Sequence, residues 1–309
     1  MSVFKIRPML PSDWNEVADL ITLSTNYWYQ TNGKAPIFTG DPMNARLFCK
    51  VYEALDPGCC VVAEHVETGR LIGSCFYHPR ETHVSIGIMN AHPNYFGVGV
   101  ARSLLTEITK FADARQLPVR LVSSAMNLDS FSLYTRAGFT PRTVFQDMYV
   151  PVEKLADVNV TGSDCIVRTA TVEDVEAMVN LEFEVSGIRR AKDYRYFISQ
   201  PEIGWNVSLC ENSAGGLDGF LCSITNIGSN MLGPGIMKSD EVALQLIISG
   251  LTRDLSRTPV FLIPVERSGL AGELYRIGAR NCELHFAQIR GEWKQPAGVI
   301  MTTFMPETG

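Results

Sequence analysis

The segment with the clearest chemical signal runs over residues 90–101 and contains two glycines one position apart. Gly97 and Gly99 stand in the order Phe-Gly-Val-Gly-Val-Ala, directly before residues with helical periodicity. Glycine lets a backbone approach a ligand closely because it has no Cβ. Successive N–H groups at a helix N-terminus attract anions such as a pyrophosphate. The turn indicates a phosphate-binding site, although an ordinary tight turn would show the same pattern.

Two other kinds of phosphate loop do not fit this segment. The two glycines are not continued to Gly-x-Gly-x-x-Gly, and they follow a late strand rather than the first one, which argues against a dinucleotide-binding fold. No Gly-Lys-Ser or Gly-Lys-Thr follows them, so the phosphate loop of ATP-binding proteins is excluded as well.

The elements around the turn must position it. We expect a strand over residues 84–90 and a helix over about 99–113. The helix has one apolar stripe, formed by Val100, Leu104, Leu105, Ile108 and Phe111. A further strand at 119–123 is followed by a helix that ends near Gly138, a natural C-cap.

The second half of the chain repeats this order. Arg7 precedes Asp13 and an amphipathic pattern, and Arg168 precedes Asp174 and a similar pattern. Leu-Tyr then occurs at matching places, ending at Tyr134 in the first half and at Tyr275 in the second. Two copies of one fold in tandem are the best interpretation of this recurrence.

The length agrees with two domains. A chain of 309 residues is about twice the common domain size of roughly 150 residues. Residues 156–164 lie in a polar stretch without periodicity, which is typical of a linker. We therefore expect a first domain over residues 1–155 and a second over residues 165–309.

Three motifs in the first half resemble the GNAT superfamily of acetyl-CoA-dependent N-acetyltransferases. A strand, then His92-Pro93 and a glycine turn into a helix, is similar to the family's Arg/Gln-x-x-Gly-x-Gly/Ala motif, here at residues 96–101. Residues 127–139 resemble the second motif, an Asn followed by Leu-Tyr and Gly-Phe. The opening Ile-Arg-Pro strand with its helix matches too. The resemblance covers about 1–150 and, more faintly, 165–309.

The resemblance implies a fold and roles for particular residues. The fold would be α/β, two tandem GNAT-like domains, each a mixed, largely antiparallel sheet flanked by helices. Main-chain groups of Ile88 and Asn90 would pair with the pantetheine arm of acetyl-CoA, and Asn127 would contact the cofactor. The amides that would hold its pyrophosphate are those of Gly97, Val98, Gly99, Val100 and Ala101.

The resemblance also implies that Tyr134 protonates the departing thiolate. An amine that attacks a thioester directly expels a thiolate, and a thiol of pKa near ~8.5 benefits from a proton donor. Two structural alternatives stay open at this point. Asn127 would serve equally as a helix cap, and Tyr134 as a core tyrosine.

Two departures from the family pattern affect the mechanism. Phe96 replaces the usual Arg or Gln, which weakens a cradle made mostly of backbone without removing it. Ser85 occupies the strand position where many family members have a catalytic Glu or His, and a hydroxyl is no general base at neutral pH. Glu64, Glu81 and His83 are the alternatives, each also readable as a surface charge. The sequence leaves the base unassigned.

The second copy is expected to be degenerate for cofactor binding. Its equivalent of the glycine turn is Gly233-Pro234-Gly235, in which Pro234 lacks an amide donor. Asp240 and Glu241 fall in the first turn of the next helix, where they would repel a pyrophosphate. One acetyl-CoA per chain follows.

Composition narrows the class of protein. The net charge is −6, the acidic excess lies entirely in the second half, and no basic stripe suggests nucleic-acid binding. No apolar run approaches the ~20 residues of a membrane-spanning helix, and the start lacks a secretory pattern. The eight cysteines show no zinc spacing and are expected to be buried thiols. We expect a cytoplasmic protein without a metal.

The sequence thus predicts an acyltransferase that moves an acetyl group from acetyl-CoA to the amine of a small molecule by direct attack. The alternative is a non-catalytic acyl-CoA-binding sensor or scaffold, which the missing base keeps open. Neither the acceptor, nor the acyl length, nor the oligomeric state follows from the sequence.

Overall fold

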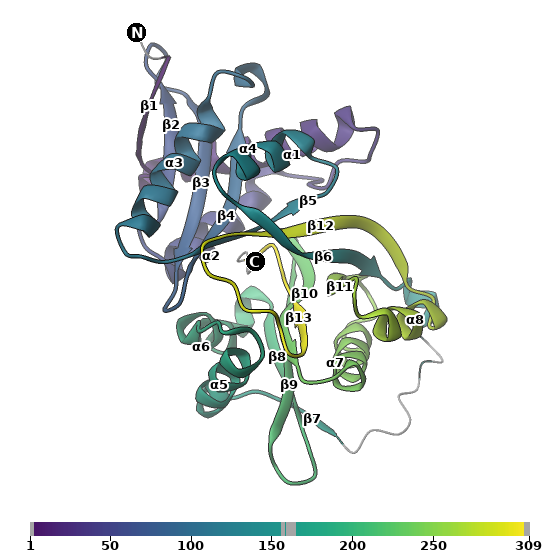
Figure 1. The fold of residues 1–309 in the computed structure, drawn as a ribbon. Coiled ribbons are helices and arrows are strands. Elements are labelled where there is room, and N and C mark those ends of the chain that lie inside the picture. The colour runs from purple at the N-terminus through teal and green to yellow at the C-terminus, as the bar shows by residue number, and fades with distance from the viewer. Residues whose placement is uncertain (1–2, 156–157, 159–164, 306–309) are drawn as a thin grey trace. The chain divides into compact units, whose positions relative to one another are not determined.

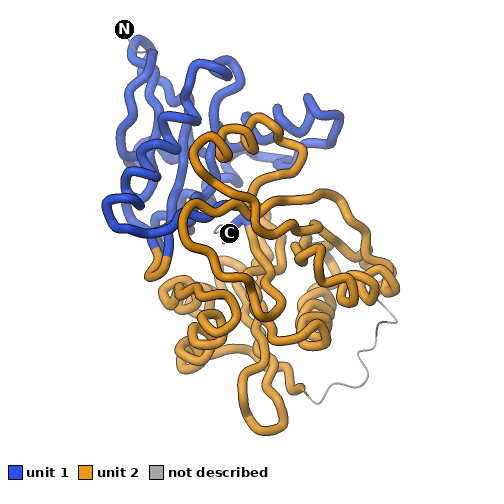
Figure 2. The backbone as a smooth tube through the Cα atoms, in the orientation of Figure 1, with its two compact units in different colours: residues 1–79, 83–121, 304–307 blue, residues 80–82, 122–303, 308–309 orange. Residues whose placement is uncertain are grey.

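The structure is a computed structural model that describes residues 3–155, 158 and 165–305. These residues form two compact units (Figure 2). Unit 1 contains the described residues of 1–79, 83–121 and 304–307, and unit 2 contains those of 80–82 and 122–303. Apart from Val158, the predicted linker lies outside the described residues.

Unit 1 is built on a mixed sheet (Figure 1). Its strands are β1 (Phe4–Pro8), β2 (Cys60–His65), β3 (Leu71–Pro79), β4 (Val84–Ala91) and the beginning of β5 (Val119–Ser124). The first four pair antiparallel in chain order, whereas β4 and β5 are parallel. The strand predicted before the glycine turn is confirmed as β4, and the helix predicted after it is confirmed as α3 (Val100–Asp113).

Helices cover both faces of this sheet: α1 (Trp14–Thr31), α2 (Arg46–Leu55) and α3 (Val100–Asp113). Side chains alternate between the faces along a strand, so ring contacts identify each face. Tyr77 of β3 contacts Phe111 of α3, with ring centroids 5.0 Å apart. The preceding residue, Phe76, contacts Tyr52 of α2 at 4.9 Å on the opposite face. We call these the α3 face and the α2 face.

Unit 2 contains the end of β5 and a larger sheet. Its strands in spatial order are β12 (Arg280–Arg290), β6 (Thr140–Tyr149), β11 (Val260–Pro264), β10 (Ser229–Met237), β9 (Leu217–Asn226), β8 (Trp205–Glu211) and β7 (Ile166–Thr169). A short strand, β13 (Val299–Met301), also pairs with β10. All these pairs are antiparallel except β10 with β11.

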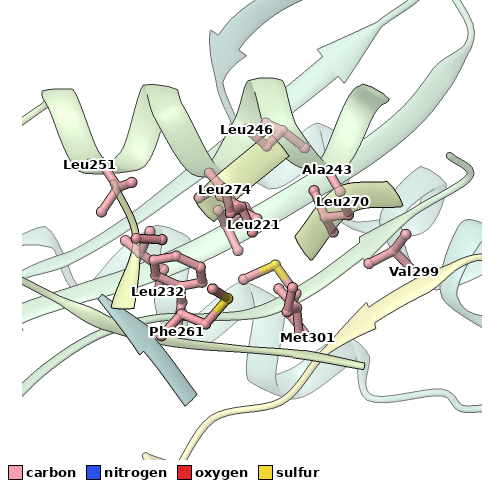
Figure 3. Packing of buried hydrophobic residues seen from close by; sticks show 14 of the residues in the cluster. Leu221, Leu232, Ala243, Leu246, Leu251, Phe261, Leu270, Leu274, Val299 and Met301 are labelled. Atoms are coloured by element: carbon pink, nitrogen blue, oxygen red, sulfur yellow. The ribbon is translucent and has the colours of Figure 1, made fainter. Parts of the chain in front are cut away.

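Five helices accompany the sheet of unit 2: α4 (Leu128–Arg136), α5 (Val175–Ser186), α6 (Ala191–Ser199), α7 (Asp240–Thr252) and α8 (Ser268–Arg276). The apolar faces of α7 and α8 pack on the strands, with Leu246, Leu274 and Phe261 fully buried (Figure 3). The mixed, largely antiparallel sheets flanked by helices agree with the fold class expected from the sequence.

One feature of unit 2 crosses the boundary of the two predicted copies. Strand β6 belongs to the first copy, yet it pairs with β11 at Phe261↔Met148 and with β12 at His285↔Phe145. Both partners belong to the second copy. The compact units therefore divide after Leu121, and the domain boundary near residue 155 stays a prediction about the sequence repeat.

Equivalent ion-pair networks stand at the start of each copy. Arg7 of β1 binds Asp13 at 2.6 Å and Glu64 of β2 at 2.5 Å. Arg168 of β7 binds Asp174 at 2.7 Å and Glu211 of β8 at 2.6 Å. The aspartate in each case also accepts a hydrogen bond from the backbone three residues earlier, ahead of α1 and α5. The repeat seen in the sequence thus has the same local structure twice.

The cysteines are only partly as expected. Cys165 and Cys210 are joined as a disulfide with their Cα atoms 5.8 Å apart, a usual spacing for such a bridge. The other six lie outside this disulfide, and all but Cys59 and Cys282 are buried. The expectation of eight unpaired thiols is wrong for that one pair.

Candidate functional site

The glycine turn lies between β4 and α3 in unit 1. After β4 ends at Ala91, His92 accepts a hydrogen bond from the N–H of Asn94 and starts a short 3₁₀ helix, η3 (Pro93–Tyr95). Gly97 has φ +81° and Gly99 has φ +92°, a left-handed conformation that favours glycine. A Cβ at either position would meet nothing within 4 Å, so glycine is needed here for its backbone conformation.

The N-terminus of α3 is free of acidic side chains. Gly99 is the N-cap residue, no side chain caps the helix, and no acidic residue lies in its first turn. The turn before it is exposed, with 49% of Val98 accessible. Exposed amide donors at the positive end of a helix dipole form an arrangement that binds phosphate oxygens. The predicted residues 97–101 are therefore brought together in a suitable conformation.

The hydrogen bonds between β3 and β4 determine which main-chain groups of β4 point away from β3. The N–H of His92 donates to Ile72 O of β3 at 2.9 Å, and Asn90 lies opposite Ser74. Because antiparallel pairing alternates every second residue, the main-chain groups of Asn90 also point toward β3. Those of Met89 and Ala91 point away. The ladder favours these two residues over Asn90 for pairing with a ligand.

A bulge and a divergence from β5 shape the same strand. Between the pairs Cys75↔Met89 and Tyr77↔Ile86, two residues of β4, Gly87 and Ile88, oppose one residue of β3. The predicted site residue Ile88 thus lies in a bulge. The pairing of β4 with β5 covers only Val84–Ser85 and Val119–Arg120. Beyond Ser85, β4 lacks a β5 partner within unit 1.

The two predicted site residues outside this turn lie in unit 2. Asn127 is the N-cap of α4, and its side-chain oxygen accepts from Ser130 N at 3.0 Å. The capping function considered from the sequence is therefore present. Tyr134 of α4 is 7% exposed, and its ring lies 5.9 Å from that of Phe139. This burial agrees with the core position considered from the sequence.

The base candidates from the sequence differ in their surroundings. Ser85 is fully buried, and its hydroxyl has no hydrogen-bond partner among the described residues. Glu64 is held by Lys5 and Arg7, whose hydrogen bonds lower the pKa of its carboxyl. Glu81 accepts from the N–H of Ala191, and His83 is 1% exposed. Glu64 therefore belongs to the ion-pair network of Arg7 and Asp13.

Residues 24–48 begin with the C-terminal part of α1. The aromatic residues Tyr27, Trp28 and Tyr29 continue α1 to Thr31. Tyr27 lines a shallow groove of about 410 Å³ along α1, together with Leu23 and Pro42. Its ring also lies 6.0 Å from that of Phe96, beside the glycine turn.

The second copy differs at the equivalent place. Gly233, Pro234 and Gly235 lie inside β10 and form no turn, so the interpretation of this segment as a degenerate phosphate loop is replaced by a strand. Only two residues separate β10 from α7, and Ser239 caps that helix by accepting from Val242 N. Asp240 and Glu241 occupy its first turn. This end of α7 is both capped and negatively charged.

Two further searches concern ions and membranes. Over residues 3–155, 158 and 165–305, no group of three His, Cys, Asp or Glu side chains is arranged to hold a metal ion. Within the same residues, every helix is too short or too polar to span a bilayer.

Known proteins resemble this chain in part of its sequence and in its fold. The model of the acetyltransferase (GNAT) family matches residues 19–139. The fold is similar to that of a protein from Pyrococcus horikoshii assigned as an acetyltransferase, with a TM-score of 0.75 at 15% identity, covering 99% of this chain and 96% of that one. No curated protein matches the sequence.

Two further solved structures agree with this result. A GCN5-related N-acetyltransferase from Sphaerobacter thermophilus gives a TM-score of 0.66 at 17% identity, over 96% of this chain and 99% of that one. A tandem GNAT protein from the clavulanic acid biosynthesis pathway gives 0.62 at 13% identity, over 93% and 98%. Residues 19–139 therefore match the GNAT family model, and the fold of the chain is similar to that of tandem GNAT proteins.

Proposed function

We propose that the protein is an N-acetyltransferase that binds acetyl-CoA at the turn of residues 97–101 and transfers the acetyl group to the amine of a small molecule. The observation that carries this proposal is the exposed glycine turn at an uncapped, acid-free helix N-terminus. The match of residues 19–139 to the acetyltransferase (GNAT) family model supports the same chemistry.

The strand next to the turn supplies the remaining cofactor contacts. We assign pairing with the pantetheine arm to the main-chain groups of Met89 and Ala91, because the ladder turns those of Asn90 toward β3. The divergence of β4 from β5 after Ser85 leaves this edge of β4 without a strand partner in unit 1. A linear ligand with amide groups can pair with such an edge.

Asn127 and Tyr134 keep their proposed roles as a cofactor contact and as the donor of a proton to the departing thiolate. Supporting observations are the amide at the N-terminus of α4 and the buried phenol on the same helix. A cytoplasmic location stays a prediction from the sequence.

The decisive experiment is turnover. The purified full chain is incubated with acetyl-CoA and a panel of primary amines comprising aliphatic diamines, amino sugars and amino acids, and release of free CoA is followed with a thiol reagent. We expect amine-dependent release with at least one class. Tight binding of acetyl-CoA without release for any amine would instead support the sensor or scaffold and contradict the proposed reaction.

A further inference from the structure

The α2 face of unit 1 contains a buried acid–histidine pair that the sequence analysis did not single out. Nδ1 of His78, on β3, lies 2.8 Å from Oδ2 of Asp56, the residue that ends α2. The two side chains are 0% and 5% exposed. A carboxylate at this distance holds the proton on Nδ1 and leaves Nε2 as the basic nitrogen. Tyr52 of α2 fixes the ring from the side, with centroids 4.6 Å apart.

Nε2 of His78 is directed at the bulge of β4. A Cβ built on Gly87 would lie 3.1 Å from this nitrogen and 3.0 Å from Cβ of Phe76. The imidazole thus lies directly over the glycine backbone, at a position that any larger residue would obstruct. Gly87 is two residues before Met89, to which the pantetheine arm is assigned above. The bulge therefore places the basic nitrogen against β4, two residues along the chain from Met89.

Other buried polar atoms lie along the same face without hydrogen-bond partners in the part of the chain that the structure describes. Ser85 is the cross-strand neighbour of His78, and its Oγ makes no hydrogen bond. On the other side of the bulge, Ser74 pairs with Asn90, and both Oγ of Ser74 and Nδ2 of Asn90 also lack partners. Buried polar groups are normally satisfied, so unpaired ones call for a ligand or water. The hydroxyl of Ser85 therefore leaves a site for a polar group beside His78.

We propose that His78, held by Asp56, is the general base of this acetyltransferase. This inference rests on the proposed function. Nε2 removes one proton from the ammonium form of the acceptor. The lone pair of the acceptor nitrogen then forms the C–N bond with the thioester carbonyl carbon. The C–S bond breaks, and its electron pair stays on sulfur. A second proton of the acceptor nitrogen is transferred to that sulfur, which gives free CoA. The imidazolium returns its proton to water.

In this mechanism Asp56 is a positioning residue, because it acts through the imidazole. The assignment also explains how β4 functions with Ser85 at the position that carries an acid or histidine in many relatives. In this assignment the base lies one strand away, on β3 opposite Ser85, and Gly87 leaves room for its imidazole.

The test compares two acceptors in the full-length chain. One is the best basic amine from the panel, and the other is hydroxylamine, which is mostly unprotonated near neutral pH and needs no base. We expect His78→Gln to lower kcat for the basic amine by about 10²–10⁴-fold and to leave hydroxylamine turnover and acetyl-CoA affinity close to wild type. Asp56→Asn, which keeps the ring, should show the same selective loss.

Phe76→Leu is the matched control, because it alters packing on the same face without proton chemistry. It should change turnover of both acceptors by the same factor. Equal effects of both His78→Gln and Asp56→Asn on the two acceptors, or no effect, would overturn the assignment of the base. A wild-type chain that does not bind or turn over acetyl-CoA would instead contradict the proposed function itself.

Discussion

At the scale of single residues, the hydroxyl of Tyr134 is the group whose role is most open to a direct test. If it donates a proton to the thiolate, its contribution arises only in the transition state. Tyr134→Phe should then lower kcat by about 10²–10⁴-fold with little change in acetyl-CoA affinity. Steady-state kinetics with the best amine, together with calorimetry, checks both quantities.

The chain offers a matched control for this substitution. Tyr275 stands at the same place in the second copy, is 48% exposed, and donates from Oη to Gln146 at 3.0 Å. Tyr275→Phe should leave kcat unchanged. A Tyr134→Phe enzyme with full kcat and reduced stability would assign Tyr134 to packing alone.

A second prediction at the residue scale concerns pH and stability. Arg168 lowers the pKa of Asp174 to about 2 through a charge-assisted hydrogen bond. Because this pKa is depressed on folding, the stabilisation is present above the ordinary pKa of Asp, roughly 3.9, and is lost as the pH falls toward the folded value. Asp174→Asn should therefore cost about 1 kcal/mol near neutral pH, after allowance for partial exposure.

Urea unfolding of wild type and Asp174→Asn measures this difference. The gap in unfolding free energy should narrow between about pH 4 and about pH 2.5. The exposed Glu184, replaced in Glu184→Gln, is the control and should show no such change. A gap that is constant over the whole range would show that the Arg168–Asp174 pair does not account for the effect.

Residue by residue, sequence patterns predicted the site unevenly. Gly97 and Gly99 could be predicted because a turn with positive φ requires glycine, and a residue type is visible in the sequence. The main-chain groups of β4 that point away from β3 could not be predicted. The bulge at Gly87 and Ile88 shifts the alternation of the strand, and the residue types show no sign of this shift. His78 was missed because a lone histidine on a buried strand has no motif, and Asp56 is distant in sequence.

At the scale of elements, the side chain of Asn127 at the N-terminus of α4 has two functions that substitutions can separate. Asn127 caps the helix through Ser130, and its amide is the proposed cofactor contact. Asn127→Ser keeps an oxygen that can cap the helix, whereas Asn127→Ala removes it and should cost about 1 kcal/mol of stability. Both variants remove the amide.

Thermal unfolding and calorimetry distinguish the two effects. We expect weaker acetyl-CoA binding in both variants and lower stability only in Asn127→Ala. Wild-type affinity in the Asn127→Ser variant would limit this residue to capping.

At the scale of the whole molecule, the two copies should differ in cofactor binding. Unit 1 has an exposed glycine turn before α3, whereas β10 leads into α7 through two residues, with Ser239 as cap and Asp240 and Glu241 in the first turn. Native mass spectrometry should find one CoA per chain. A second specifically bound CoA would contradict the claim that the second copy is degenerate.

The tandem repeat itself was predictable from the sequence, but its strand pairing was not. The Arg–Asp pattern marked the start of each copy, whereas no sequence pattern was assigned to the strands β6 and β12. Which strands become neighbours depends on long-range packing, and each of these segments is equally suited to pair within its own copy. The insertion of β6 between β11 and β12 therefore emerges only in the structure.

The central claim is that acetyl-CoA binds at the turn of residues 97–101, and Gly99→Glu tests it most directly. A carboxylate at the N-cap of α3 would oppose the pyrophosphate by charge and by bulk. Gly99→Ala has the same backbone strain without the charge, and Gly58→Glu places a carboxylate at another open glycine with φ +75°. By calorimetry, we predict that folded Gly99→Glu loses detectable acetyl-CoA binding, Gly99→Ala retains part of it and Gly58→Glu retains all of it. Wild-type affinity in folded Gly99→Glu would contradict the account.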